Sequence, residues 1–363
     1  MYPMLNPLRR VQNWHDIVKL PFQGTLNLAG RGIFFLLRCK STRQPPDEIR
    51  SILIIRRNRI GDAICTLPWI QAIKEQTPNI IVDILCEEYN SPIFTNSNYI
   101  DHVFNIPKSY LGIRFLQSLH PTIRELRKKH YDVAMNAGGF SSRSALLALV
   151  ARAKYTVGTR STKGHLFDLV WDNSIKHEDL DDSTHQVMRI AAIGRLTGLP
   201  FDSNLPFAFL SKSERTFEDN ENGKKSALLC PLVNRSNSRW PDENWTSLSI
   251  KLVEQGISIN WLSYAPPNAP GELLKVHAKP GIRGLFTTND LIEIIPKFSI
   301  VICSEGGISH LAPALQIPCV ALSGANIVKT WRPWSDLCEL IEMKDIREIS
   351  TSMVLNAAIL KLE

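Results

Sequence analysis

The sequence predicts an α/β protein of two domains, each a parallel sheet covered by helices on both faces, with a cleft between them. Three observations lead to this prediction. Short apolar runs alternate with amphipathic stretches of helix length from residue 51 onward, and a polar segment interrupts this alternation before it starts again. Runs that are apolar throughout, such as ILII and IIVDIL, are typical of buried parallel strands. The 363 residues also suffice for two domains and two cores.

The first domain is expected over residues 51–212. Its predicted strands are 52–56, 80–85, 103–106 and 132–136, and its predicted helices are 67–76, 113–129 and 141–151. Residues 155–184 are more polar and are expected to be irregular. A further helix is expected at 185–198, ending at Gly198 before Pro200. The strand–helix alternation requires right-handed crossovers, so this half is Rossmann-like.

The second domain is expected over residues 227–363, after a polar linker at 213–226. Its predicted strands are 227–230, 257–262, 300–303, 319–322 and 339–343, and its predicted helices are 242–255, 271–278, 289–297, 308–315 and 350–361. Two such halves place a cleft between the carboxyl ends of two sheets, where ligands of these folds bind.

Charge is distributed unevenly along the chain. Of the net charge of +7, +5 lies in residues 1–50, which hold eight Lys and Arg against three acidic residues. This basic N-terminal arm favours contact with an anionic membrane surface and argues against a nucleic-acid partner, because the folded body is nearly neutral. Its longest apolar run is five residues, too short for a membrane span or a signal peptide. An extra helix packed on the first domain is the alternative interpretation of the arm.

The seven cysteines contain no CxxC pair, and four of them lie in or beside apolar runs: Cys86, Cys230, Cys303 and Cys319. We expect buried free thiols in a reducing, cytoplasmic compartment, with neither a disulfide framework nor a zinc site. No metal site and no cofactor are predicted.

The stretch RRNRIGDAICTLP, residues 56–68, concentrates charge where the first strand meets a helix. Gly61 allows an unusual backbone conformation, and Asp62 suits either a helix cap or a general base facing the cleft. The pattern alone favours the cap. Arg56, Arg57 and Arg59 are either solvated loop charges or a rim that faces an anionic ligand.

The stretch SEGGISHLAPAL, residues 304–315, directly follows a predicted strand. Gly306 and Gly307 let the backbone approach a ligand, and the helix that follows offers its first amides to a phosphate. Neither GxGxxG nor GxxxxGK[ST] is present, so dinucleotide enzymes and P-loop NTPases lack support. His310 either touches the ligand or bonds to backbone.

The stretch NRSNSRWPDENW, residues 234–245, follows the first strand of the second domain. Asp242 can cap a helix whose inner face carries Trp245, Leu248 and Leu252. Arg235 and Arg239 lie in the preceding loop, and one or both can hold a phosphate, since a guanidinium matches phosphate oxygens. Trp240 is expected in a packed turn.

Together the three stretches resemble glycosyltransferase family 9, whose members include the lipopolysaccharide heptosyltransferases. The family has a Gly-Asp turn with a Thr/Leu-Pro helix, a loop ending in Trp-Pro, and an Asp-Thr-Gly-x-x-His segment, and here the matching residues are GDAICTLP, NSRWP and EGGISH. The sequence departs from the family at Ser238, where a lysine is usual, and at Glu305 and Gly306, which replace Asp and Thr.

The resemblance implies a GT-B fold, with the acceptor on the first domain and a nucleotide-sugar donor on the second. It makes Asp62 the catalytic base of an inverting, metal-independent sugar transfer. The donor-binding positions that it implies are Arg239, Glu272, Glu305, Gly306, Gly307, Ser309 and His310, and the acceptor or anion rim is Arg56, Arg57, Arg59 and Gly61.

The expected reaction transfers a sugar, with heptose from ADP-heptose the leading choice, to a lipopolysaccharide core or another lipid-linked acceptor. The expected location is cytoplasmic, with peripheral contact at the inner membrane. Two alternatives stay open: a non-catalytic nucleotide-sugar-binding protein and a GT-B sugar-nucleotide epimerase.

Overall fold

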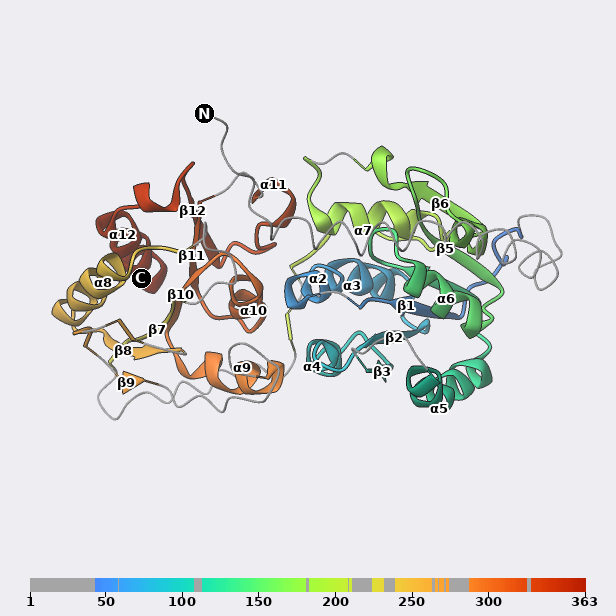
Figure 1. Cartoon of the computed structure of the whole chain (residues 1–363), viewed down its shortest axis with the longest axis horizontal. Helices are drawn as coiled ribbons and strands as arrows, with labels where there is room; N and C mark the ends of the chain where they lie inside the picture. The colour runs from blue at the N-terminus through green and yellow to red at the C-terminus, as the bar shows by residue number, and fades with distance from the viewer. Residues whose placement is uncertain are drawn as a thin grey trace, which may run out of the picture.

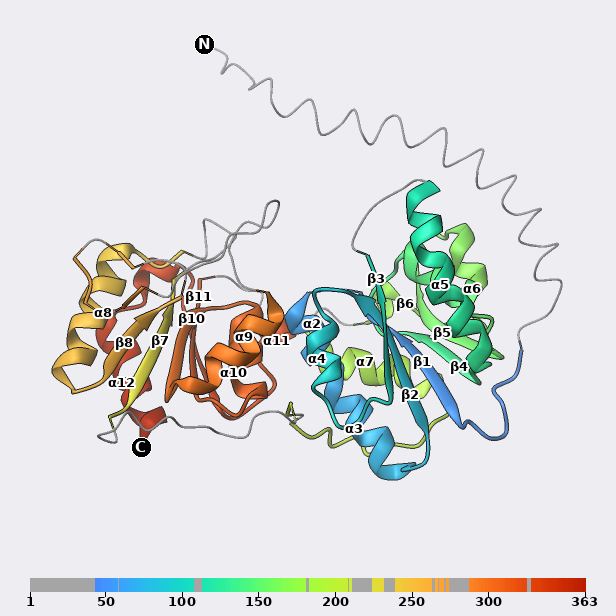
Figure 2. The same cartoon turned by 90° about the horizontal axis from the view of Figure 1, so that it is seen from below.

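Two separate parallel sheets, each flanked by helices, make up the protein (Figures 1 and 2). The computed structural model describes residues 43–57, 59–107, 113–180, 183–207, 209–210, 224–231, 239–262, 265–266, 268–270, 272–273, 287–324 and 328–363. Most of the basic arm, most of the expected linker and the loop containing Ser238 lie outside these residues. Within them, no helix is long and apolar enough to cross a membrane.

The first sheet has the strand order β3-β2-β1-β4-β5-β6, with every neighbouring pair parallel. Its strands are β1 Ser51–Ile55, β2 Ile81–Glu87, β3 His102–Ile106, β4 Val133–Asn136, β5 Tyr155–Arg160 and β6 Asn173–Lys176. The helices around it are α2 Ile60–Ile64, α3 Leu67–Gln76, α4 Ser91–Thr95, α5 Ile113–Lys129, α6 Ser142–Ala151 and α7 Gln186–Arg195, with 3₁₀ turns η2 Leu166–Val170 and η3 His177–Asp179.

The second sheet has the order β12-β11-β10-β7-β8-β9 and is also parallel. Its strands are β7 Ser226–Cys230, β8 Ser258–Trp261, β9 Glu272–Leu273, β10 Ile300–Ser304, β11 Cys319–Ser323 and β12 Cys338–Glu342. The helices are α8 Asp242–Glu254, α9 Thr288–Ile294, α10 Gly307–Ala314, α11 Val328–Trp331 and α12 Thr351–Leu362, with 3₁₀ turns η5 Ile295–Lys297 and η6 Ile346–Glu348.

Both sheets reverse their strand order at equivalent places, between β1 and β4 and between β7 and β10. Ligands of open parallel sheets bind outside the carboxyl ends of the strands at such a switch point. The stretches after β1 and after β10, two of the three that the sequence marked as chemically active, lie at this edge of their sheets.

Apolar side chains of the strands are buried on both faces of each sheet, as expected. In β1, Ile52 and Ile54 join one buried cluster, and Leu53 and Ile55 join another that includes α6. The first of these clusters continues into Val301 of the second sheet and forms one connected core across the two halves. The expectation of two separate cores is therefore wrong on the side where the halves meet.

The expectation of irregular structure at 155–184 is also wrong, because β5 and β6 lie there. Thr156 and Thr159 make the sequence of β5 polar, but both residues are buried in the structure. Their hydroxyls donate to the carbonyls of Val170 and Gly138 at 2.6 and 3.0 Å. β6 is an edge strand and carries polar residues for that reason.

One further expectation fails locally. The helix expected at 271–278 is replaced at its start by the two-residue strand Glu272–Leu273, and residues 274–286 lie outside the described part of the chain. By contrast, the expected inner face of α8 and the packed Trp240, whose indole N–H donates to the Ile349 carbonyl at 2.9 Å, are confirmed.

Candidate active site

Asp62 lies in α2, just beyond the carboxyl end of β1, and its side chain is 9% exposed. One carboxylate oxygen accepts from the Arg56 guanidinium at 2.9 Å, and the other accepts from the Arg59 backbone N–H at 3.2 Å. The second contact closes the first turn of α2, in which Arg59 is the N-cap residue and Asp62 the third helical residue. Asp62 therefore caps an amide before it, and not the amides after it as the sequence suggested. The first contact is an ion pair that holds the carboxylate in one orientation.

Arg56 is buried, not part of a solvent-facing rim. It is 1% exposed, and its guanidinium also donates to the carbonyl of Asp62 at 3.0 Å and to the carbonyl of Ala137 at 2.5 Å. Ala137 directly follows β4, so this side chain ties the two strands at the switch point together. The prediction that Arg56 belongs to an anion-binding rim is therefore wrong, because its charge is paired with the Asp62 carboxylate.

The other two arginines differ from each other. Arg57 pairs with Glu87 at 2.7 Å, at the end of β2, with both side chains largely buried. Its charge is already balanced by that carboxylate, so a rim role for Arg57 is corrected as well. Arg59 is the exposed one of the three.

Tyr89 is a neighbour of this cluster that the sequence did not single out. Burial, then the nearby Glu87 and Asp62 carboxylates, raises the pKa of its phenol to about 12. Its backbone carbonyl accepts from the hydroxyl of Thr288 in the second half at 2.5 Å. A tyrosine shortly after a strand at a ligand-binding edge is the signal that would have found it.

The stretches at 56–68 and 304–315 meet directly. An added Cβ on Gly61 would lie 2.8 Å from the His310 ring, and one on Gly307 would lie 3.2 Å from Ile60. α2 and α10 therefore pack backbone against side chain, and the glycines are required for this close approach. Gly61 is helical with no positive φ, so its expected backbone role is wrong and its real role is lack of bulk.

His310 is buried in this contact, 4% exposed, with protein partners for its ring. Nδ1 lies 3.9 Å from Cys65 Sγ, and the ring hydrogen-bonds to the Trp331 backbone. Burial lowers the pKa of His310 to about 4, so the imidazole is neutral at pH 7. Burial raises the pKa of Cys65 to about 12, so Cys65 is an uncharged thiol at pH 7.

The side chains of Ser309 and His310, both predicted to bind the donor, have partners within the protein. The Ser309 hydroxyl donates to the Gly306 carbonyl at 2.8 Å and accepts from the Gly306 N–H at 3.2 Å, which caps α10. Both side chains shape the first turn of α10. Glu305, Gly306 and Gly307, which lead into that turn, are each half-buried at the helix start.

Ser304, the last residue of β10, was also missed from sequence. Its buried hydroxyl has no hydrogen-bond partner within the described residues. It lies at the switch-point edge of the second sheet, directly before the glycine pair. A polar residue ending an apolar strand was the available signal.

Two predicted donor-binding residues, Arg239 and Glu272, remain to be placed. Arg239 is exposed and pairs with Asp242 at 3.0 Å; Asp242 is the first residue of α8, and Pro241 occupies the cap position. Glu272 is described by its backbone only, in β9.

Comparison with known proteins establishes the family of this chain. Residues 119–353 match the model of glycosyltransferase family 9 (heptosyltransferase). The chain belongs to glycosyltransferase family 9. It is therefore an enzyme that transfers sugars, and the resemblance inferred from its motifs is confirmed.

Individual relatives of this family 9 glycosyltransferase are distant but cover most of its length. It is 22% identical to lipooligosaccharide heptosyltransferase 2 of Haemophilus influenzae, over 81% of this chain and 88% of that protein. It is also 22% identical to lipopolysaccharide heptosyltransferase 3 of Escherichia coli, over 76% and 83%.

Solved structures establish the GT-B fold of this family 9 glycosyltransferase. E. coli heptosyltransferase WaaC with ADP superposes with a TM-score of 0.68 at 18% identity, covering 86% of this chain and 99% of that one. The same protein with ADP-2-deoxy-2-fluoro heptose gives 0.67 at 17% identity, covering 86% and 99%. The family 9 glycosyltransferase from Veillonella parvula gives 0.70 at 17% identity, covering 89% and 99%.

Proposed function

We propose that this glycosyltransferase moves heptose from ADP-heptose to a lipopolysaccharide core or a related lipid-linked acceptor, by an inverting and metal-independent mechanism at the cytoplasmic face of the inner membrane. The family and the heptosyltransferase relatives support the substrate class. The observation that carries the mechanism is the direct packing of α2, with Asp62, on α10, whose first turn is suited to phosphate.

Asp62 acts as the general base in this proposal. It takes the proton of an acceptor hydroxyl while that oxygen forms a bond to the anomeric carbon of the donor. The two contacts from Arg56 and Arg59 use one lone pair on each oxygen, and a carboxylate offers about four, so acceptance of a further hydrogen is still possible. A preoriented carboxylate avoids reorganisation during the reaction.

The bond that breaks joins the anomeric carbon to the diphosphate, which leaves with the bonding electrons. Its charge is met by the amides at the start of α10, after the Gly306–Gly307 pair, and by Arg239. Arg59, exposed beside Asp62, would then meet an anionic group of the acceptor.

The test compares Asp62→Asn with Asp132→Asn. Asp132 is a similarly buried carboxylate at the other end of the sheet, paired with Lys154 at 2.7 Å. We expect transfer from ADP-heptose to a lipopolysaccharide core acceptor to fall about 100-fold or more in Asp62→Asn. Asp132→Asn should change stability but keep the turnover of its folded fraction.

Two control measurements interpret the result. ADP-heptose should raise the melting temperature of both variants, because binding to the native state stabilises it. Equal transfer by wild type and Asp62→Asn would refute the base assignment. Donor binding without transfer to any acceptor would favour a nucleotide-sugar-binding protein, and a changed sugar in the absence of acceptor would favour an epimerase.

A further inference from the structure

The outer face of the first sheet carries an apolar surface along α6 and η2, which pack together. Leu146 on α6 is 37% exposed and Leu169 on η2 is 56% exposed. At one end, His165 lies between Phe140 and Phe167, with ring centroids 5.2 and 5.5 Å apart. We call Phe140, Arg143, Leu146, Lys163, Phe167 and Leu169 the α6 face.

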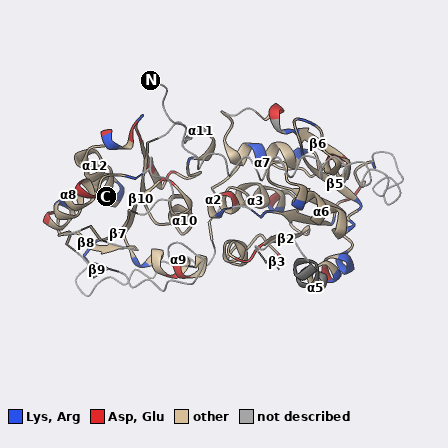
Figure 3. Ribbon diagram, in the orientation of Figure 1, with Lys and Arg blue, Asp and Glu red and all other residues tan. Residues whose placement is uncertain are grey.

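Positive charge surrounds these apolar side chains. Residues 121–170 contain nine Lys and Arg against three Asp and Glu, and Figure 3 shows basic residues on α5 and α6. Arg143 and Lys163 are both exposed and lie three and two residues along the chain from Phe140 and His165. Of the three acids, Asp132 pairs with Lys154, Glu125 pairs with Lys128, and Asp168 accepts backbone N–H groups at 2.7 and 2.9 Å. The net charge of this segment is therefore +6.

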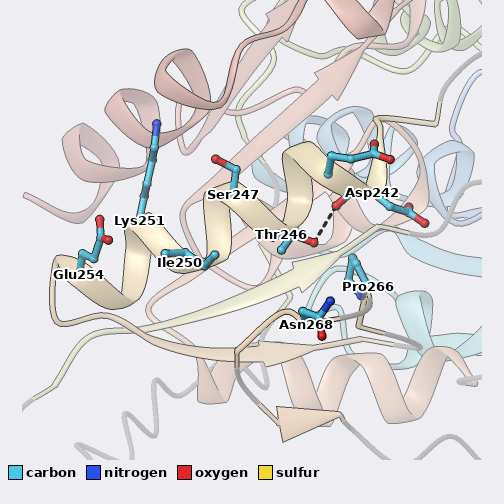
Figure 4. Close-up of a pocket in the computed structure, with 9 residues that line it drawn as sticks. Asp242, Thr246, Ser247, Ile250, Lys251, Glu254, Pro266 and Asn268 are labelled. Atoms are coloured by element: carbon cyan, nitrogen blue, oxygen red, sulfur yellow. Dashed lines mark hydrogen bonds between the residues drawn. The ribbon is translucent and has the colours of Figure 1, made fainter.

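A second exposed apolar group provides a contrast. Ile250 and Val253 on α8 and Leu360 on α12 are 44%, 45% and 69% exposed on two helices that pack together. α8 carries three acidic residues and one lysine. Ile250 lines a cavity of about 560 Å³ together with Asp242 and Glu254 (Figure 4). An anionic surface would repel this group and attract the α6 face.

The α6 face is also connected to the candidate active site. Arg56, which holds Asp62, donates to the carbonyl of Ala137, in the segment that joins β4 to α6. Both the start of α6 and the Lys163 turn follow the carboxyl ends of strands, the same edge of the sheet at which Asp62 lies. A flat anionic surface on this face would border that edge.

We propose that the α6 face docks this enzyme on an anionic lipid surface, with Leu146 and Leu169 entering the interfacial region and Arg143 and Lys163 contacting lipid phosphates. The proposal rests on the proposed function, since a lipid-linked acceptor is what such docking would present to Asp62. Exposed leucines with flanking basic residues suit lipid binding, because apolar burial and attraction to anionic headgroups add together.

The experiment is co-sedimentation of the full chain with phosphatidylcholine vesicles, with and without phosphatidylglycerol. We expect wild type to pellet with the anionic vesicles. Leu146→Ser/Leu169→Ser and Arg143→Glu/Lys163→Glu should each reduce the partition coefficient about tenfold or more. The matched controls Val253→Ser/Leu360→Ser and Lys297→Glu/Lys344→Glu should bind like wild type.

The outcomes separate this proposal from its alternatives and from the proposed function. Equal pelleting of wild type and α6-face variants would overturn it and place the contact elsewhere, as in the basic arm. Loss of binding to a random-sequence RNA, with vesicle binding intact, would overturn it in favour of a nucleic-acid surface. Transfer to a water-soluble, deacylated acceptor should be unchanged in these variants. Absence of that transfer in wild type would count against the proposed function, independently of vesicle binding.

Discussion

At the scale of single residues, the main revision concerns Arg56. A cluster of arginines after a strand reads as an exposed anion site, because sequence does not show which side chains the fold will bury. In the structure Arg56 is enclosed and binds Asp62 and two carbonyls, which makes it a positioning residue. A base and a cap are compatible in one carboxylate because its two oxygens have different partners.

The Arg56–Asp62 pair should be energetically important. We expect Arg56→Met to lower the free energy of unfolding by about 3–5 kcal/mol, because it leaves a buried carboxylate without its partner. Arg347→Met is the matched control: its partner Asp345 is 35% exposed and Arg347 is 75% exposed. That change should leave the midpoint of urea denaturation nearly unchanged, because solvent screens an exposed ion pair. Additive effects of Arg56→Met and Asp62→Asn in a double-mutant cycle would show that the pair is not coupled.

At the scale of elements, the contact between α2 and α10 defines the site. The sequence predicted that each lies at a strand end, and this followed from local patterns: an apolar run, then glycine, then helix. That Gly61 lies against His310 was beyond those patterns, since the two residues are far apart in the chain. The role of Gly61 was misassigned for this reason.

This contact predicts a specific effect of Gly61→Ala. In a helix, Gly to Ala ordinarily stabilises by about 0.5–1 kcal/mol. Here the methyl group would overlap a buried ring, so we expect a loss of about 1–3 kcal/mol and reduced transfer as α2 shifts. In a His310→Ala background, Gly61→Ala should lower the free energy of unfolding by less than it does in the wild type. An equal loss in both backgrounds would mean that the His310 ring is not the obstacle.

At the scale of the whole molecule, the two halves share a buried core and two neutral histidines. The His185 ring lies tilted against Trp334, with ring centroids 4.7 Å apart, and its Nε2 lies 2.8 Å from the Arg332 carbonyl oxygen. Burial lowers the pKa of His185, and burial with His185 nearby lowers that of His310 to about 4. Protonating either ring places a charge between the halves.

Stability should therefore depend on pH in a defined direction. Between pH 6.5 and 4 the unfolded chain binds a proton at His310 that the folded chain does not, so stability is complete above about pH 6.5 and falls as pH drops to 4. The loss from His310 amounts to about 3 kcal/mol. His310→Asn should flatten this part of the curve in denaturation measurements, whereas His102→Asn, at an exposed site, should not. A wild-type slope retained in His310→Asn would contradict the assignment.

The sequence by itself determined the two α/β halves, nearly all helices and strands with strong apolar periodicity, the two strand-end stretches and the family. These depend on local physics, namely which residues suit a buried strand or begin a helix. The tertiary structure decided what each polar side chain does: Arg56 buried on Asp62, Arg57 on Glu87, His310 between Cys65 and Trp331, Gly61 small for packing. Burial and partner choice arise from contacts between segments distant in sequence, and the free energy of a charge depends on those contacts more than on its neighbours along the chain.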